Sequence, residues 1–208
     1  MNKIVFLYFN QLQKYDIETF RHSYRVSIIS CLIGQQLGLS INELNTLKDA
    51  AYLHDLGKLK VPQKILNKPG DLSSEEWAHI KDHPRNGYRL LKRAKYPTEQ
   101  ISNAILAHHE HYDGRGYPNR IGGEDIPYLA RIITVADGLD AMVNVRPYRN
   151  PTPVPDAYKE IKECAGSQFD PYVTNALSKV NSNELSRGIY KEQQLKNKLL
   201  FNMYFLTP

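Results

Sequence analysis

The chain has 208 residues, enough for one well-packed domain but too few for two full ones. Hydrophobic residues make up 41% and charged residues 24%, a composition that excludes a disordered or fibrous protein. The net charge of +5 favours anionic partners such as nucleotides, nucleic acids or phosphorylated metabolites. Cys31 and Cys164 are far apart and lack a metal-binding spacing, so we expect no disulfide framework and a reducing, cytoplasmic setting.

The start of the chain predicts a docked segment followed by a long helix. The apolar run at residues 4–9 is too short to span a membrane, so we expect residues 1–13 to pack on the protein as an N-terminal segment. Apolar residues at helical spacing predict a helix over about 12–37. Within it Glu18 and His22 share a face, as a metal-binding helix requires, although such a pair alone is usually a solvated surface pair.

The next helix delivers the sequence His-Asp-Leu-Gly-Lys, on which the interpretation of the chain depends. A capping box at residues 40–43 predicts a helix that runs to about His54. Neighbouring residues of a helix project about 100° apart, so the His54 imidazole can bind one metal ion while the Asp55 carboxylate bridges two. Gly57 is expected to end the helix and to leave Lys58 close to the metals. A lone His-Asp pair, by contrast, is usually a hydrogen-bonded pair in a core.

Further histidines follow at spacings that suit the same site. His79 and His83 are four residues apart on another predicted helix, and we expect His83 to be a metal ligand and His79 to lie on the surface. Residues 99–109 predict a short helix that ends in the doublet His108-His109. Because adjacent imidazoles diverge, the doublet suits two metal ions better than one.

A glycine-rich loop and a strongly apolar helix complete the candidate site. By composition alone, residues 110–118 predict an ordinary turn. Residues 129–142 predict an apolar helix that carries Asp137 and Asp140. A carboxylate is costly to bury in such a helix unless it is paired or bound to metal, so Asp137 is the next expected ligand.

The remainder of the chain predicts a basic loop, two closing helices and a tail. Arg146 and Arg149 are three residues apart and can grip phosphate oxygens, although a solvated basic loop has the same pattern. Helices are expected over about 156–165 and 171–181. We expect residues 183–208 to form a C-terminal extension that packs on the domain or on a second subunit, which leaves a homodimer open.

Taken in order, these residues resemble the HD-GYP subgroup of the HD metal-dependent phosphohydrolases. Residues 54–58 match the HD and DxGK pattern of the family, residues 108–110 match its HHE signature, and residues 113–118 match its GYP signature. The resemblance covers roughly residues 14–180, and we take the domain as 14–182. It implies an all-α fold, an HD-domain helical bundle with a GYP loop and a metal centre in the bundle core.

The resemblance also implies an activity and a ligand set. The implied enzyme is a metal-dependent phosphodiesterase that hydrolyses cyclic di-GMP to pGpG, GMP or both, with two or three divalent ions, iron or manganese. The metal ligands carried over from the family are His22, His54, Asp55, His83, His108, His109 and Asp137. Glu18 stands where some members supply a carboxylate to a third metal.

The expected mechanism needs no protein nucleophile. A metal-activated hydroxide attacks phosphorus in line, and Asp55 holds the metals. Asp140 is expected to orient the hydroxide as a base, and Lys58 to assist the leaving group. The expected substrate contacts are Lys58, Tyr117, Arg146 and Arg149.

Two alternatives remain at this level. One is an HD hydrolase of another nucleotide, such as cyclic GMP-AMP or a guanosine polyphosphate. The other is a non-catalytic receptor or docking module that binds cyclic di-GMP, or a diguanylate cyclase (GGDEF) domain, through the GYP loop. The chain departs from the family at residues 143–145, where a Thr-Ser-Asp-like run is common, and it lacks a sensor domain. Either its regulation comes from elsewhere or the chain is a fragment. We expect no DNA partner and no membrane span.

Overall fold

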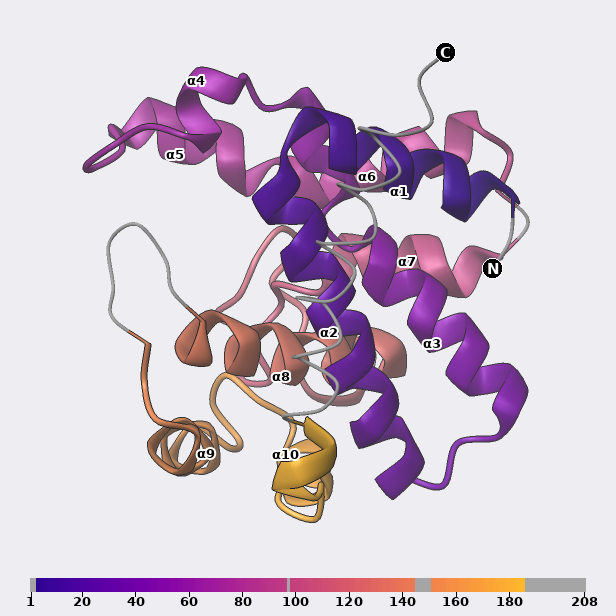
Figure 1. The fold of residues 1–208 in the computed structure, drawn as a ribbon, viewed down its shortest axis with the longest axis vertical. Coiled ribbons are helices and arrows are strands. Elements are labelled where there is room, and N and C mark those ends of the chain that lie inside the picture. The colour runs from indigo at the N-terminus through magenta and orange to yellow at the C-terminus, as the bar shows by residue number, and fades with distance from the viewer. Residues whose placement is uncertain (1–2, 97, 145–150, 186–208) are drawn as a thin grey trace, which may run out of the picture.

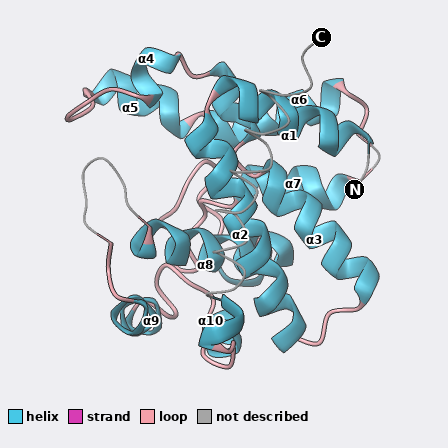
Figure 2. Ribbon diagram, in the orientation of Figure 1, coloured by secondary structure: helices cyan, strands magenta, loops and turns pink. Residues whose placement is uncertain are grey.

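A computed structural model describes residues 3–96, 98–144 and 151–185. Within these ranges the chain is built from helices and contains no strand, which confirms the all-α prediction (Figures 1 and 2). Arg146, Arg149 and most of the expected C-terminal extension lie outside the described residues. The elements are α1 (Lys3–Tyr15), α2 (Ile17–Gln36), α3 (Ile41–Leu53), η1 (Leu56–Lys60), α4 (Gln63–Leu66), α5 (Ser74–Lys81), α6 (His83–Arg93), α7 (Glu99–Ala107), η2 (Gly123–Asp125), α8 (Tyr128–Val143), α9 (Val154–Glu163) and α10 (Pro171–Leu177).

The prediction of one long helix over residues 12–37 is wrong at its start, because the helix is interrupted at Asp16. Asp16 has extended backbone angles, and its carboxylate accepts a hydrogen bond of 2.9 Å from the Thr19 amide. A side chain that satisfies an amide of the first turn is the usual start of a helix. The apolar periodicity continues across this cap and conceals it. The expected docked segment is itself a helix, α1, which packs on α2 and α3.

Helix α2 runs through the middle of the molecule and contacts α1, α3, α8 and α10 (Figure 1). Its core face buries Val26, Ile29 and Ile33 against fully buried residues of its neighbours such as Leu47 and Ile132. Burial of this apolar surface is the main force that holds the helices together. The packing brings α2, the end of α3 and the middle of α8 to one place, where their predicted ligands meet.

Two helix starts follow the sequence closely. Ser40 and Glu43 form the expected capping box at the start of α3, and Ser73 and Glu76 form a second one at α5. Each cap satisfies amides that the helix leaves unpaired, a contribution of about 1 kcal/mol. A capping box depends on nearby residues, so the sequence alone predicted the one at Ser40.

Gly57 has a different role from the one expected. Helix α3 ends at Leu53, and Gly57 lies within η1. A Cβ atom on Gly57 would lie 1.8 Å from the carbonyl oxygen of His83 and 2.6 Å from the Gly87 amide nitrogen. Gly57 therefore lets η1 touch the backbone of α6, and this contact sets the distance between the two histidine segments.

Helices α9 and α10 close the fold against α8, and α10 also packs on α2. They correspond to the two expected closing helices. Helix α9 has the expected length but begins and ends two residues earlier, and α10 begins at Pro171 as expected but ends at Leu177. No helix in the described ranges has both the length and the apolar character that a membrane span requires.

Candidate metal centre

The His-Asp pair is buried at the end of α3. His54 and Asp55 are each 1% exposed and lie between Leu53 and Leu56, which are fully buried and draw the segment into the core. The Nδ1 atom of His54 lies 2.8 Å from the carbonyl oxygen of Ala51. Because a carbonyl oxygen can only accept, Nδ1 is the protonated nitrogen, and Nε2 presents a lone pair to the interior.

His83 and His108 are held in the same way. Each donates Nδ1–H to the carbonyl three residues earlier, Ile80 for His83 and Ile105 for His108, at 2.7 Å in both cases. Their Nε2 atoms are therefore both acceptors, yet they lie 3.1 Å apart. Two lone pairs at this distance repel one another unless a cation binds both, so the arrangement fits a metal ion.

His22 of α2 joins the cluster from the other side. Its Nε2 atom lies 3.2 Å from Nε2 of His54 and 3.0 Å from Oδ1 of Asp137 on α8. Its Nδ1 atom donates to Asp140 Oδ2 at 2.7 Å. Residues more than 100 positions apart in the sequence thus meet at one point.

Asp55 lies between two groups of potential ligands. Its Oδ1 atom is 3.2 Å from Nε2 of His83, while its Oδ2 atom is 3.5 Å from Nε2 of His54 and 3.7 Å from Nε2 of His22. One group is His83, His108 and His109, and the other is His22, His54 and Asp55; within each, the ligand atoms lie within 4.8 Å of one another. A metal ion in either group would therefore find an oxygen atom of Asp55 within reach.

Most of the groups already have the protonation states that a metal requires. Burial lowers the pKa of His83 to about 3 and that of His109 to about 4, and it also lowers the pKa of His54. Burial alone would raise the pKa of Asp55, but Lys58 and the neighbouring histidines hold it well below the usual range. Neutral imidazoles beside ionised carboxylates are the forms that bind divalent cations.

His22 is the exception. Burial alone would lower its pKa, but hydrogen bonds to Asp137 and Asp140 raise the pKa to about 9. Without a metal, His22 is therefore protonated at neutral pH. A cation that binds its Nε2 atom must displace this proton.

A family model described as an HD domain matches residues 9–173. The chain belongs to the HD-domain family. Its signatures and its relatives place it in the HD-GYP group. A cyclic di-GMP phosphodiesterase from Thermotoga maritima is 42% identical over 173 residues, which cover 82% of this chain and 47% of the relative. A 3'3'-cGAMP-specific phosphodiesterase 2 from Vibrio cholerae is 36% identical over 176 residues, which cover 84% of this chain and 34% of the relative.

A solved structure shares the fold. The HDG"Y"P protein Bd1817 from Bdellovibrio bacteriovorus has a TM-score of 0.62 and is 24% identical, over 75% of this chain and 50% of that one. The HD domain described here spans less than half the length of the two curated relatives.

Glu18 lies apart from the other predicted metal ligands. Its carboxylate is 67% exposed, pairs with Arg21 and belongs to neither group of potential ligands. The side chain leaves the first turn of α2 toward solvent, so the described geometry gives a third metal no support. His79 lies on the surface, as expected.

Lys58 and Tyr117 each contact one of the potential metal ligands. The Nζ atom of Lys58 is 2.6 Å from Oδ2 of Asp55, and its side chain is 22% exposed, so it faces both the ligands and solvent. The ring of Tyr117 stacks on His109 with 4.8 Å between centroids. A Cβ atom on Gly116 would lie 2.2 Å from the His111 amide nitrogen, so only glycine lets the GYP loop fold back this tightly.

Asp140 has a setting that the sequence did not suggest. Its carboxylate accepts hydrogen bonds from His22, from Arg25 at 2.7 and 3.0 Å, and from Asn144 at 2.8 Å. It therefore faces the far nitrogen of His22, which is a positioning contact, and not the region between the ligand groups. Arg25 and Asn144 were missed as site residues; their spacing, three after His22 and four after Asp140, was the available signal.

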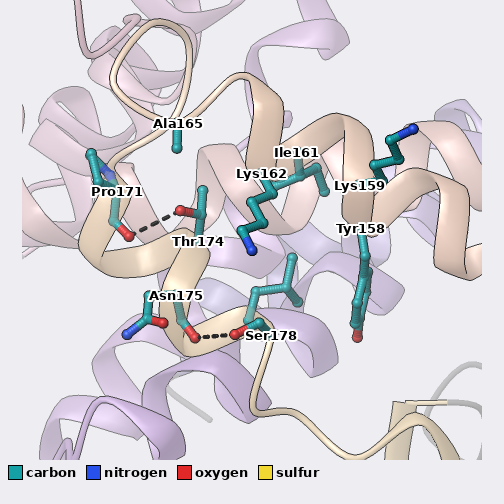
Figure 3. Close-up of a pocket in the computed structure, with 10 residues that line it drawn as sticks. Tyr158, Lys159, Ile161, Lys162, Ala165, Pro171, Thr174, Asn175 and Ser178 are labelled. Carbon is teal, nitrogen blue, oxygen red and sulfur yellow. Dashed lines mark hydrogen bonds between the residues drawn. The ribbon is translucent and has the colours of Figure 1, made fainter.

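A separate cavity of about 470 Å³ lies between α9 and α10 (Figure 3), and no histidine is among its lining residues in the described part of the chain. Thr174 and Ser178 line it, but their hydroxyls donate to the carbonyl oxygens of Pro171 and Asn175 within their own turns. None of the predicted site residues that the structure describes lines this cavity. The candidate site is therefore the pair of ligand groups around Asp55 and not this cavity.

Proposed function

We propose that the chain is a metal-dependent phosphodiesterase that hydrolyses cyclic di-GMP to pGpG, GMP or both. The observation that carries this proposal is the position of Asp55 between two groups of histidines, each with nitrogen lone pairs turned inward. Imidazole and carboxylate donors suit iron or manganese, and we propose two ions. Curated relatives named as cyclic di-GMP phosphodiesterases support the choice of substrate.

The residues have distinct tasks in this proposal. When bound, the metal ions supply Lewis-acid activation of the phosphodiester and of the attacking water. Asp55 and the inward-facing histidines hold the ions, and Asp140 fixes the ring of His22. Lys58 binds a phosphate oxygen and can protonate the leaving oxygen, because its ammonium lies beside the ligands and reaches solvent.

Arg146 and Arg149 remain proposed contacts for the second phosphate. Both lie outside the described residues. Substitution of each by methionine tests the assignment, since loss of a phosphate contact should raise KM more than it lowers kcat.

The proposed activity is tested by metal analysis after anaerobic purification, followed by chromatography of cyclic di-GMP incubated with iron-loaded and manganese-loaded protein. We expect pGpG or GMP to appear and to disappear on chelation. Asp55→Ala should abolish turnover in a protein that keeps its helical circular dichroism, while His79→Ala should leave turnover unchanged. Intact cyclic di-GMP beside a filled metal site would contradict the proposal and favour a receptor.

A second substrate deserves the same assay, because the 36% identical relative from Vibrio cholerae is named as specific for 3'3'-cGAMP. Faster cleavage of 3'3'-cGAMP than of cyclic di-GMP would assign the chain to that class.

Partners and location are part of the proposal. We place the chain in the cytoplasm, with a GGDEF domain docked on the GYP loop and a second copy of the chain as candidate partners. The side chain of Arg115 in this loop is 81% exposed, which supports a docking role. Co-purification with and without Arg115→Ala tests it.

A further inference from the structure

A row of rings leads from the metal centre to the surface. Tyr117 stacks on His109, and the Nζ atom of Lys81 lies 5.7 Å from the ring centroid of Tyr117 and 5.7 Å from that of Trp77. Trp77 and Lys81 belong to α5, the helix that ends just before His83. The series therefore begins at His109, a proposed ligand, and ends at Trp77 on the protein surface.

The outer end of this row is open. Trp77 is 46% exposed, although a side chain as large and apolar as an indole is usually buried. A single exposed apolar residue is ordinary on a protein surface, so exposure alone decides nothing. What distinguishes Trp77 is that its ring lies beside the ammonium of Lys81, and that the other ring beside this ammonium, Tyr117, stacks on His109.

The ammonium of Lys81 has hydrogen-bond donors that are available to a ligand. Among the described residues no carboxylate is paired with it, and the nearby Glu76 is paired with Lys68 at 2.6 Å. A lysine ammonium has three donors, and ring faces attract it without accepting a conventional hydrogen bond. An acceptor-rich ligand edge could therefore bind Lys81 while a ring of the same ligand covers Trp77.

We propose that Trp77 and Lys81 form a guanine-binding subsite for one base of the cyclic dinucleotide; this inference rests on the proposed function. A purine stacks on an exposed indole, a contact that any base can make. Lys81 adds selectivity, because guanine presents O6 and N7 as neighbouring acceptors, whereas adenine replaces O6 with an amino donor that an ammonium cannot pair with. Stacking on Trp77 thus provides affinity for any base, and Lys81 provides the preference for guanine over adenine.

The inner wall of the subsite is fixed in advance. The Tyr117 amide donates to the carbonyl of His109 at 3.0 Å, and Arg85 of α6 donates to the carbonyl of Pro118 at 2.9 Å. These bonds join the GYP loop to the ligand segment and to α6, so little order has to be gained when a base binds.

The protein supplies its own probe, because Trp77 is the only tryptophan in the chain. The metal-loaded protein is titrated with GMP and with AMP, which share the phosphate and differ in the base. We expect GMP to quench the fluorescence of Trp77 at lower concentration than AMP does. Lys81→Met should reduce this preference about tenfold, the loss expected for one hydrogen bond from a charged donor. Lys179→Met, which removes the same charge from an exposed lysine after α10, should leave the preference unchanged.

Turnover gives an independent measurement. Trp77→Ala should raise KM for cyclic di-GMP about 5- to 150-fold with little change in kcat, the range found for loss of one base–aromatic stack. Trp77→Phe keeps a stacking face and should lose much less. Tyr172→Ala removes another exposed aromatic side chain, on α10, and should have no effect.

The outcomes separate this inference from the function on which it rests. Normal hydrolysis of cyclic di-GMP, with no selective quenching of Trp77 by GMP in the native chain and an unchanged KM in Trp77→Ala and Lys81→Met, would overturn the subsite and leave the phosphodiesterase intact. Absence of hydrolysis together with selective quenching by GMP would support the subsite and refute the phosphodiesterase.

Discussion

In four of the proposed metal ligands, the inward-facing nitrogen is set by a hydrogen bond on the far side of the ring. His54, His83 and His108 use a backbone carbonyl three residues earlier, whereas His22 uses the carboxylate of Asp140. A carbonyl is present at every position of a chain, but a carboxylate can be removed by mutation. Asp140 is therefore the point at which the support of the site can be tested with one substitution.

Asp140→Asn should weaken Mn²⁺ binding by about 10- to 100-fold, the usual cost of losing a partner behind a ligand histidine. The amide keeps the size of the side chain but lacks the negative charge that strengthens the hydrogen bond from the His22 ring. Calorimetric titration of Mn²⁺ measures the loss. Asp156→Asn, at an exposed position on α9, is the control. Unchanged affinity in Asp140→Asn would contradict a positioning role for Asp140.

The histidines also predict how stability depends on pH when no metal is bound. His22 has a pKa of about 9 in the folded chain against an ordinary 6.5, so its stabilising contribution is complete below pH 6.5 and is lost as the pH rises toward 9. His83 and His109 have pKa values of about 3 and about 4, so their protonation in the unfolded chain lowers stability as the pH falls from 6.5 to about 4.

The stability of the chelated protein should therefore be greatest between about pH 6.5 and 7 and decline on both sides. Urea midpoints measured from pH 4 to pH 9 test this shape. His22→Gln should flatten the alkaline decline and leave the acid decline in place. A midpoint that keeps rising up to pH 9 would contradict the assignment of a proton to His22.

At the scale of elements, the contact of η1 with α6 determines whether the two ligand groups face each other. A Cβ atom at residue 57 would meet the carbonyl oxygen of His83, and neither backbone can move without moving a ligand segment. Gly57→Ala should cost about 3 kcal/mol, the upper part of the range for overpacking, and should also lower metal affinity.

Gly38→Ala is the matched comparison. Gly38 has a φ of +74° and nothing within 4 Å of its added Cβ, so the substitution introduces backbone strain of about 1 kcal/mol far from the ligands. We expect it to keep metal affinity. Chemical denaturation and Mn²⁺ titration of both variants measure the two effects, and equal metal affinity in both would refute a positioning role for Gly57.

The same elements show what the sequence could and could not predict. The capping box at Ser40 depends on residues three apart, and the sequence predicts it correctly. The cap at Asp16 was missed because apolar periodicity runs across it. The role of Gly57 and the pairing of Arg25 with Asp140 depend on residues 26 and 115 positions away, which no local pattern reveals. The inward ligands were predictable because their motif spacing is local, even though their meeting is not.

At the scale of the whole molecule, the proposed ligands come from helices that are distant in sequence. His22 lies on α2, Asp55 follows α3, His83 begins α6, His108 follows α7 and Asp137 lies on α8. These elements already pack through their apolar faces. Metal ions that bind all of them would add cross-links between the helices, and these form only in the folded chain.

Metal removal should therefore lower thermal stability by an amount set by mass action. At a free metal concentration about a thousandfold above Kd, binding to the folded state alone contributes about 4 kcal/mol. For a chain of this size such a contribution raises the melting temperature by about 8 to 16 °C. Circular dichroism melts of Mn²⁺-loaded and chelated protein measure the difference. His83→Ala should remove most of it by breaking one ligand group, and the exposed His79→Ala should preserve it. If chelation leaves the melting temperature of the native chain unchanged, the helices do not depend on metal, and the inward-facing nitrogens must be satisfied by protons or water instead.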